Sequence, residues 1–136
     1  MLKRDSLPEF EQPRTGFDLV RMENNFVNAI EEMGAQIHNI TRSKGFWDAA
    51  GGVNRNQPEM IALMHSELSE ALEALRKDPE AADKHCPQFT NLEVELADTI
   101  VRILDMAHGL GLRVGPALCE KVRFNETRQP MHGKQF

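Results

Sequence analysis

The residues from Asn91 to His108 constrain the fold more than any other part of the sequence. At about 100° per residue on an α-helix, their apolar side chains cover roughly two-thirds of the circumference. A helix that is apolar on so many sides has to be surrounded by other elements, so we expect it to be the central helix of the fold. Its first residue is predicted at Phe89 or Asn91, and Gly109 and Gly111 follow it as stop signals.

Three further segments are predicted to be helical from their apolar spacing or from their start and stop signals. They cover residues 18–42, from Pro58 to Lys77, and from Gly115 to just before Pro130. No stretch alternates between apolar and polar residues for long enough to build a sheet. The sequence therefore predicts an all-α fold that is similar to a four-helix bundle.

The chain of 136 residues has room for one compact domain, which we place at residues 17–130. Before it, residues 1–16 combine charges of both signs with two prolines and a glycine, and we expect a flexible arm. After it, residues 131–136 form a short basic tail. Residues 43–57 are rich in glycine and asparagine and predict a long loop, which in a small domain is usually functional or mobile.

Charge and composition exclude several classes of protein. The 16 basic and 21 acidic side chains give a formal net charge of −5, which argues against a nucleic acid polymer as partner. The apolar runs are far shorter than the roughly 20 residues that cross a bilayer, and the N-terminus lacks the apolar stretch of a secretory signal. We therefore expect a cytoplasmic protein that does not enter a membrane. Cys86 and Cys119 are too few for a disulfide framework or a zinc cage.

Four carboxylates stand where a helix would normally carry apolar side chains. On the helix that begins at Pro58, Glu67 falls within the apolar half and Glu70 lies at its edge. On the central helix, Glu95 and Asp98 repeat the same spacing of three residues within a narrow polar strip. Two acidic pairs are thus predicted to lie against the core.

Such carboxylates repel one another and lose hydration in a packed interior, so a cation is expected beside them. Arg102 can pair with Asp98 or Asp105 at helical spacing, but one guanidinium does not balance the whole set. A hard divalent ion does, and Mg²⁺ prefers oxygen ligands, with Mn²⁺ as a possible substitute. A single acidic pair favours a solvated helix face, whereas two pairs in apolar faces favour a metal site.

The two acidic motifs also resemble the signature of a known family. Glu67-Leu68-Ser69-Glu70 and Glu95-Leu96-Ala97-Asp98 are similar to the ExxE and ExxD signature of the all-α nucleoside triphosphate pyrophosphohydrolases, the MazG-like group related to dimeric dUTPases. The resemblance covers residues 24–136, including the basic segment 121–128 and the tail, but not the preceding arm.

The resemblance implies a MazG-type fold that assembles as a homodimer or homotetramer. It also implies Mg²⁺-dependent cleavage of an NTP or dNTP into the monophosphate and pyrophosphate, with a metal-bound water as nucleophile. Glu67, Glu70, Glu95 and Asp98 would be the catalytic metal ligands.

Further residues are candidates for binding the nucleotide. Lys121 and Asn125 lie one helical turn apart and match substrate-contacting positions of the family, although both also suit a solvated helix face. Arg128, His132 and Lys134 form a positive segment that is able to fold over phosphates, or simply a solvated terminus.

The long loop contains Trp47, the single Trp of the chain. The resemblance places base-contacting aromatics in this loop, while capping of the core is an almost equal alternative because Trp buries a large area. His38 lies off the apolar stripe and is expected at the surface. Asp105 and His108 have the spacing found in helical di-iron sites, but such sites need two Glu-x-x-His words and the chain has none.

Two other functions remain open from the sequence. A non-catalytic helical protein could bind a basic partner through its acidic strip, and a member of the family could bind nucleotide without turnover. Both keep the helical fold and differ in the chemistry of the acidic residues. The small number of aromatic residues and the short core predict a homo-oligomer in every case.

Overall fold

A computed structural model describes residues 16–48 and 52–129, with side chains from Arg21 onward except that of Val53. It contains four α-helices, which are α1 (Gly16–Ser43), α2 (Gln57–Lys77), α3 (Asn91–Leu110) and α4 (Val114–Glu126), and the short 3-10 helix η3 (Gly52–Asn54). Among the described residues the only β pairing is an isolated bridge between Ala82 and Thr90. The predicted all-α class is confirmed. The expected tail, and the expected arm up to residue 15, lie outside the described residues.

The ends of α2 and α3 follow from local capping. The Asn56 side chain accepts a hydrogen bond from the Glu59 backbone N–H at the start of α2. Thr90 and Glu93 form a reciprocal capping box at the start of α3. The expected end of this helix at His108 is two residues too early, because Gly111, with φ 67°, is the residue that adopts the left-handed conformation.

The fourth helix is shorter than the sequence predicts. It begins at Val114 without a side-chain cap and ends at Glu126, whereas the expected end lay just before Pro130. The Thr127 and Arg128 backbone N–H groups close the final turn on the carbonyl groups of Phe124 and Asn125. The chain therefore leaves the helix through a turn at Thr127 and Arg128 and does not continue as helix toward Pro130.

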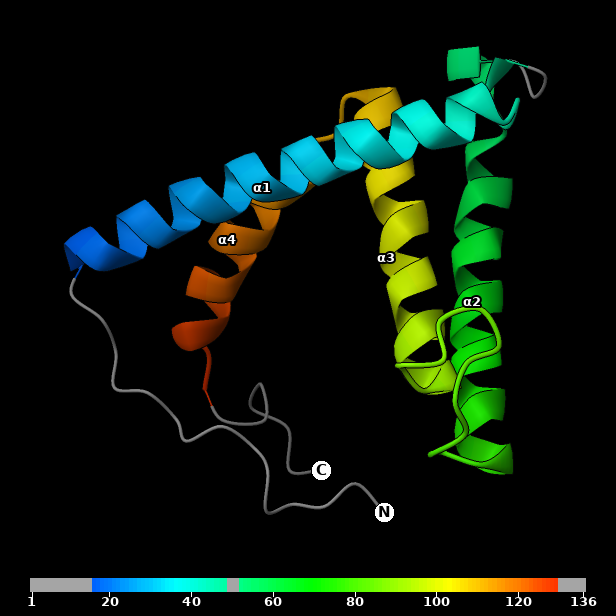
Figure 1. Cartoon of the computed structure of the whole chain (residues 1–136). Helices are drawn as coiled ribbons and strands as arrows, with labels where there is room; N and C mark the ends of the chain where they lie inside the picture. The colour runs from blue at the N-terminus through cyan, green and yellow to red at the C-terminus, as the bar shows by residue number, and fades with distance from the viewer. Residues whose placement is uncertain (1–15, 49–51, 130–136) are drawn as a thin grey trace.

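The helices are arranged as an antiparallel pair crossed by a third helix. α2 and α3 run side by side, α1 lies across one end of the pair, and α4 packs on the other half of α1 (Figure 1). α3 contacts both α1 and α2, as expected for the central helix. The four helices of one chain do not close into a bundle, because α4 makes its main contacts with α1.

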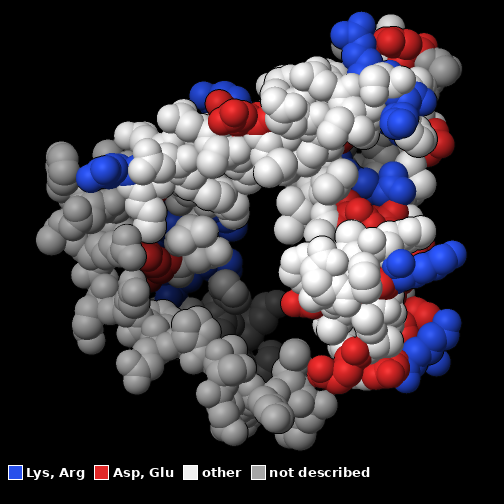
Figure 2. Space-filling model, viewed as in Figure 1, with Lys and Arg blue, Asp and Glu red and all other residues white. Residues whose placement is uncertain are grey.

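The core of the single chain is small. Its buried apolar residues are Trp47, Met60, Ala71, Leu104 and Ala107, and no large described side chain is completely buried. Many large apolar side chains stay exposed on all four helices, and Figure 2 shows broad uncharged areas over this face of the molecule. They include Met33 and Ile40 of α1, Ile61 and Leu72 of α2, Ile100 of α3, and Val122 and Phe124 of α4.

The helices of the described residues do not qualify as membrane spans. None of them combines the length and the apolar character that crossing a bilayer requires. This agrees with the short apolar runs of the sequence.

Candidate metal centre

Three carboxylates meet between α2 and α3. Glu67, Glu95 and Asp98 each have an oxygen within 4.8 Å of the others. Glu67 on α2 is buried, Glu95 on α3 is half-buried, and Asp98, one turn further along α3, is exposed. The antiparallel packing of the two helices therefore brings together two acidic motifs that are separated by more than twenty residues in the sequence.

The carboxylates of this group destabilise one another's charged forms. Burial, and then the charges of Glu70 and Glu67, raise the pKa of Glu95 above its ordinary value. Burial and the charge of Glu67 also raise the pKa of Asp98, while the nearby Arg102 acts in the opposite direction. A divalent ion bound between them would remove this repulsion.

Glu70 stands outside the group of three. It is exposed on α2, although its charge is the largest electrostatic influence on Glu95 after burial. The two residues line one shallow depression between the end of α2 and the start of α3. The structure thus brings three of the four expected ligands together, and the fourth, Glu70, lies beside this group on the surface of α2.

Arg102 binds Glu67 across the two helices. Its Nε–H donates a hydrogen bond to Oε1 of Glu67 at 2.6 Å, and its Nη2 atom makes an ion-pair contact with the same oxygen at 2.6 Å. The sequence predicted a partner within α3, at Asp98 or Asp105, and this prediction was wrong. The hydrogen bonds of Arg102 go to α2 because α2 brings Glu67 within reach of the polar strip of α3.

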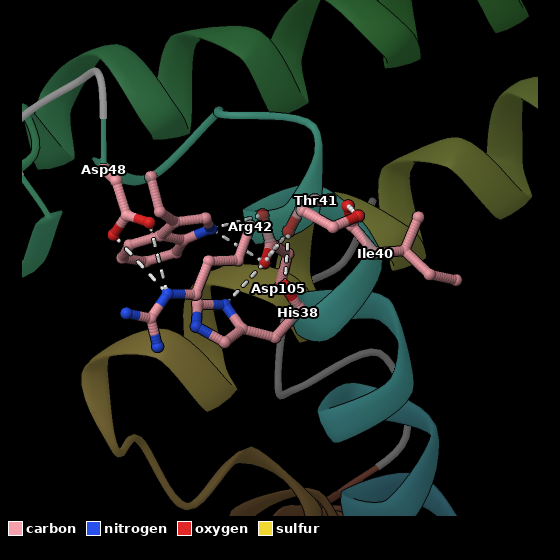
Figure 3. A network of polar contacts seen from close by, with 8 residues as sticks. His38, Ile40, Thr41, Arg42, Asp48 and Asp105 are labelled. Atoms are coloured by element: carbon pink, nitrogen blue, oxygen red, sulfur yellow. Dashed lines mark hydrogen bonds and ion pairs between the residues drawn. The ribbon is translucent and has the colours of Figure 1, made fainter.

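Asp105 is the centre of a second polar cluster. Its carboxylate contacts His38 Nδ1 at 2.9 Å and accepts hydrogen bonds from Thr41 Oγ1 at 2.7 Å and from Trp47 Nε1 at 3.0 Å (Figure 3). The cluster ties the end of α1 and the following loop to α3. His38 was expected at the surface, and this was wrong: its side chain is only 14% exposed because it turns toward Asp105.

Trp47 is buried, with 2% of its surface exposed. Its ring lies against Gly109, where an added Cβ would overlap the indole. This placement fits the alternative in which Trp47 caps the core. Arg55 places its guanidinium 5.5 Å from the ring centroid.

The expected nucleotide-binding residues of α4 and of the turn after it lie apart from the carboxylates within one chain. Lys121, Asn125 and Arg128 are exposed, and α4 makes its main contacts with α1 (Figure 1). The Lys121 ammonium lies 4.7 Å from the centroid of the Phe124 ring. His132 and Lys134 lie outside the described residues.

One carboxylate near the centre was missed by the sequence reasoning. Asp83, in the link between α2 and α3, is buried and accepts hydrogen bonds from the backbone N–H groups of Cys86 and His85 at 2.7 and 2.8 Å, which lower its pKa. Its charge also contributes to the raised pKa of Glu95 and of Asp98. The link has no helical period, so the acidic residue at its centre carried no pattern that would have marked it.

No protein family model, curated protein or solved structure matches this chain. The metal centre is therefore judged from the chemistry of its own residues. Three carboxylates, one of them buried, offer only hard oxygen ligands, which suit a divalent ion such as Mg²⁺, Mn²⁺ or Ca²⁺.

Proposed function

We propose that this protein hydrolyses a nucleoside triphosphate, NTP or dNTP, to the monophosphate and pyrophosphate in a Mg²⁺-dependent reaction. The observation that carries the proposal is the convergence of Glu67, Glu95 and Asp98 between α2 and α3. These three residues belong to the two acidic motifs that resemble the signature of the MazG-like pyrophosphohydrolases. The resemblance supplies the reaction, and the geometry supports the use of these residues as ligands.

The carboxylates act as ligands in this proposal and not as nucleophiles. When bound, Mg²⁺ supplies an acidified water and stabilises the charge that develops on phosphate oxygens. Glu67 is fixed by burial and by its contact with Arg102, whereas Glu95 and Asp98 keep access to solvent and to a substrate. Glu70 joins the set from its border position once the side chains adjust to the ion.

The basic residues of α4 and the C-terminal tail complete the proposal. Lys121, Asn125 and Arg128, with His132 and Lys134, would contact the triphosphate and the nucleoside. Since α4 lies apart from the carboxylates of its own chain, these contacts would come from a second copy in a homodimer or homotetramer. The exposed apolar side chains on all four helices supply surface for such an assembly.

The test is pyrophosphate release from a panel of ribonucleoside and deoxyribonucleoside triphosphates with Mg²⁺. We expect turnover of at least one nucleotide, and a loss of about 100-fold in Glu95→Gln and Asp98→Asn. Glu32→Gln is the matched control, because Glu32 is exposed on α1 and does not line the depression that holds Glu70 and Glu95.

Three results would contradict the proposal. The first is absence of pyrophosphate release with every nucleotide, and the second is full activity in Asp98→Asn. The third is calorimetric binding of a non-hydrolysable triphosphate without turnover of the natural nucleotides, which identifies a nucleotide-binding protein. Absence of both binding and turnover favours a non-catalytic protein that binds a basic partner.

A further inference from the structure

Glu67 has two competing roles in the centre. It is the buried member of the three carboxylates that can hold a metal ion, and its Oε1 atom already accepts a hydrogen bond from Arg102 Nε at 2.6 Å and makes an ion-pair contact with Nη2. The Glu67 side chain is 10% exposed, so the guanidinium supplies charge neutralisation that water does not. The same carboxylate therefore has a cation partner before any metal arrives.

We propose that Arg102 is an internal counter-cation of this centre: it neutralises Glu67 while no metal is bound, and it leaves that carboxylate when a divalent ion enters. The inference rests on the proposed function for its metal site. It adds to the metal site a residue, Arg102, that lies outside both acidic motifs.

Electrostatic repulsion between the incoming divalent ion and the Arg102 guanidinium would drive the guanidinium away from Glu67. A divalent ion held by Glu67 on either oxygen lies within a few ångströms of a guanidinium that is bound to the same group, and like charges at that distance repel strongly away from bulk water. The Arg102 side chain is 38% exposed and Glu67 only 10%. The guanidinium is thus the partner that can move, while the buried carboxylate stays in place.

The released guanidinium turns toward solvent, because 38% of the Arg102 side chain is already exposed, at the edge of a small cleft. The cleft is lined by Arg55, Met60, Leu63, Arg102 and Asp105. The Asp105 carboxylate is already bound by His38, Thr41 and Trp47. Once it has left Glu67, the Arg102 guanidinium is free to bind a phosphate group of a metal-bound anion, because guanidinium groups bind phosphate with paired donors.

A purely structural role for Arg102 predicts the opposite result. If the guanidinium only holds Glu67 in position for the metal, its removal loosens the ligand and weakens metal binding. If it is a counter-cation, its removal eliminates the repulsion and strengthens metal binding. The sign of the change in metal affinity separates the two roles.

The experiment is calorimetric titration of the full-length chain with Mn²⁺, without nucleotide. We expect Arg102→Met to bind Mn²⁺ about tenfold more tightly than the wild type, since a unit charge near the ion is removed. Arg76→Met is the matched control, because it removes the same charge from an exposed pair on α2 and should change the affinity less than about twofold. An unchanged or weaker affinity in Arg102→Met overturns the proposal.

A second titration tests the anion. With Mg²⁺ at saturation, Arg102→Met should bind inorganic tripolyphosphate about tenfold more weakly than the wild type, because one phosphate-binding guanidinium is lost. Equal affinity in the two proteins overturns the assignment of the released Arg102 guanidinium to phosphate.

Measurement on the wild type covers the case in which Arg102→Met fails to fold. The Arg102 Nε–H resonance, assigned by its absence from Arg102→Lys, should shift when Mg²⁺ is added, and an unmoved resonance at saturating Mg²⁺ overturns the inference. Metal binding by the wild type without any effect of Arg102 contradicts this inference alone. Absence of metal binding in every protein contradicts the proposed function as well.

Discussion

Glu95 and Asp98 are held where their charges are unfavourable. Burial and neighbouring carboxylates raise both pKa values, so the protein maintains these two charges at a cost in stability. Residues that lower stability while they serve a reaction are common at functional sites. This cost agrees with a functional role for the group of three carboxylates, which rests on their convergence between α2 and α3.

Neutral replacements should therefore stabilise the metal-free protein. We expect Glu95→Gln and Asp98→Asn each to raise the free energy of unfolding at neutral pH by about 0.5 kcal/mol, a small value because solvent screens these groups. Both variants should lose the stabilisation that Mg²⁺ gives the wild type. Urea unfolding with and without Mg²⁺ measures both effects, and Glu32→Gln, at an exposed position of α1, should change neither. Destabilisation of the metal-free protein by either replacement would contradict this account.

The raised pKa values also predict how metal binding depends on pH. Between the ordinary pKa of a carboxyl group and its raised value in the fold, the folded protein binds more protons than the unfolded chain. The contribution of Glu95 and Asp98 to stability therefore falls as the pH rises through that window. Protons compete with the ion over the same window, so metal affinity should rise with pH through that window. Mn²⁺ titrations across this range measure the effect, and a flat profile would contradict it.

At the scale of elements, Asp105 joins three parts of the chain. Its carboxylate binds side chains from α1 and from the loop before α2, and it belongs to α3 itself. Trp47 Nε1 lies 3.0 Å from both carboxylate oxygens, so a replacement that keeps only one acceptor oxygen cannot reproduce the arrangement. The cluster thereby holds the loop against the helices that carry the metal centre.

Replacement of this carboxylate should loosen the junction. We expect Asp105→Asn to lower the free energy of unfolding by about 2 to 3 kcal/mol, because charge-assisted hydrogen bonds are lost and the amide places a donor toward other donors. Asp48→Asn is the control: its contact with Arg42 is exposed and should contribute less than about 0.5 kcal/mol. Urea denaturation followed by Trp fluorescence measures both. Equal stability of the two variants would show that the cluster contributes little.

The sequence predicted correctly those features that depend on a single helix, namely the approximate bounds of α1 and α2 and which side chains of α2 face the core. Apolar spacing located α1 and α2 to within two residues, and the wheel of the second helix correctly placed Glu67 toward the core. Contacts between helices were predicted less well. The partner of Arg102 and the burial of His38 depend on how α3 is positioned against α2 and α1, and no single helical wheel contains that information.

At the scale of the whole molecule, one chain leaves its core incomplete. Large apolar side chains remain exposed on every helix, including Leu72 at 59% and Ile100 at 54%. Exposed apolar surface of this extent is typical of protein–protein contacts. The α4 residues proposed to bind nucleotide also lie apart from the carboxylates of their own chain.

We therefore expect a homodimer or homotetramer at micromolar concentration, with exposed faces of α2 and α3 in the contact. Ile100→Glu should shift the molar mass toward the monomer, because a charge in an apolar interface is costly. Light scattering coupled to size exclusion measures both proteins. Gln36→Glu, at an exposed polar position of α1, is the control for an added charge. A monomeric mass for the wild type would contradict the expected assembly.

The central claim is that Glu67, Glu95 and Asp98 together hold a divalent ion. The most direct test is a crystal structure of the protein soaked in Mn²⁺, with anomalous diffraction used to locate the metal. The account predicts one anomalous peak or more between α2 and α3, within bonding distance of oxygens from all three side chains. A well-ordered centre without any peak, or a peak held by other residues, would contradict it.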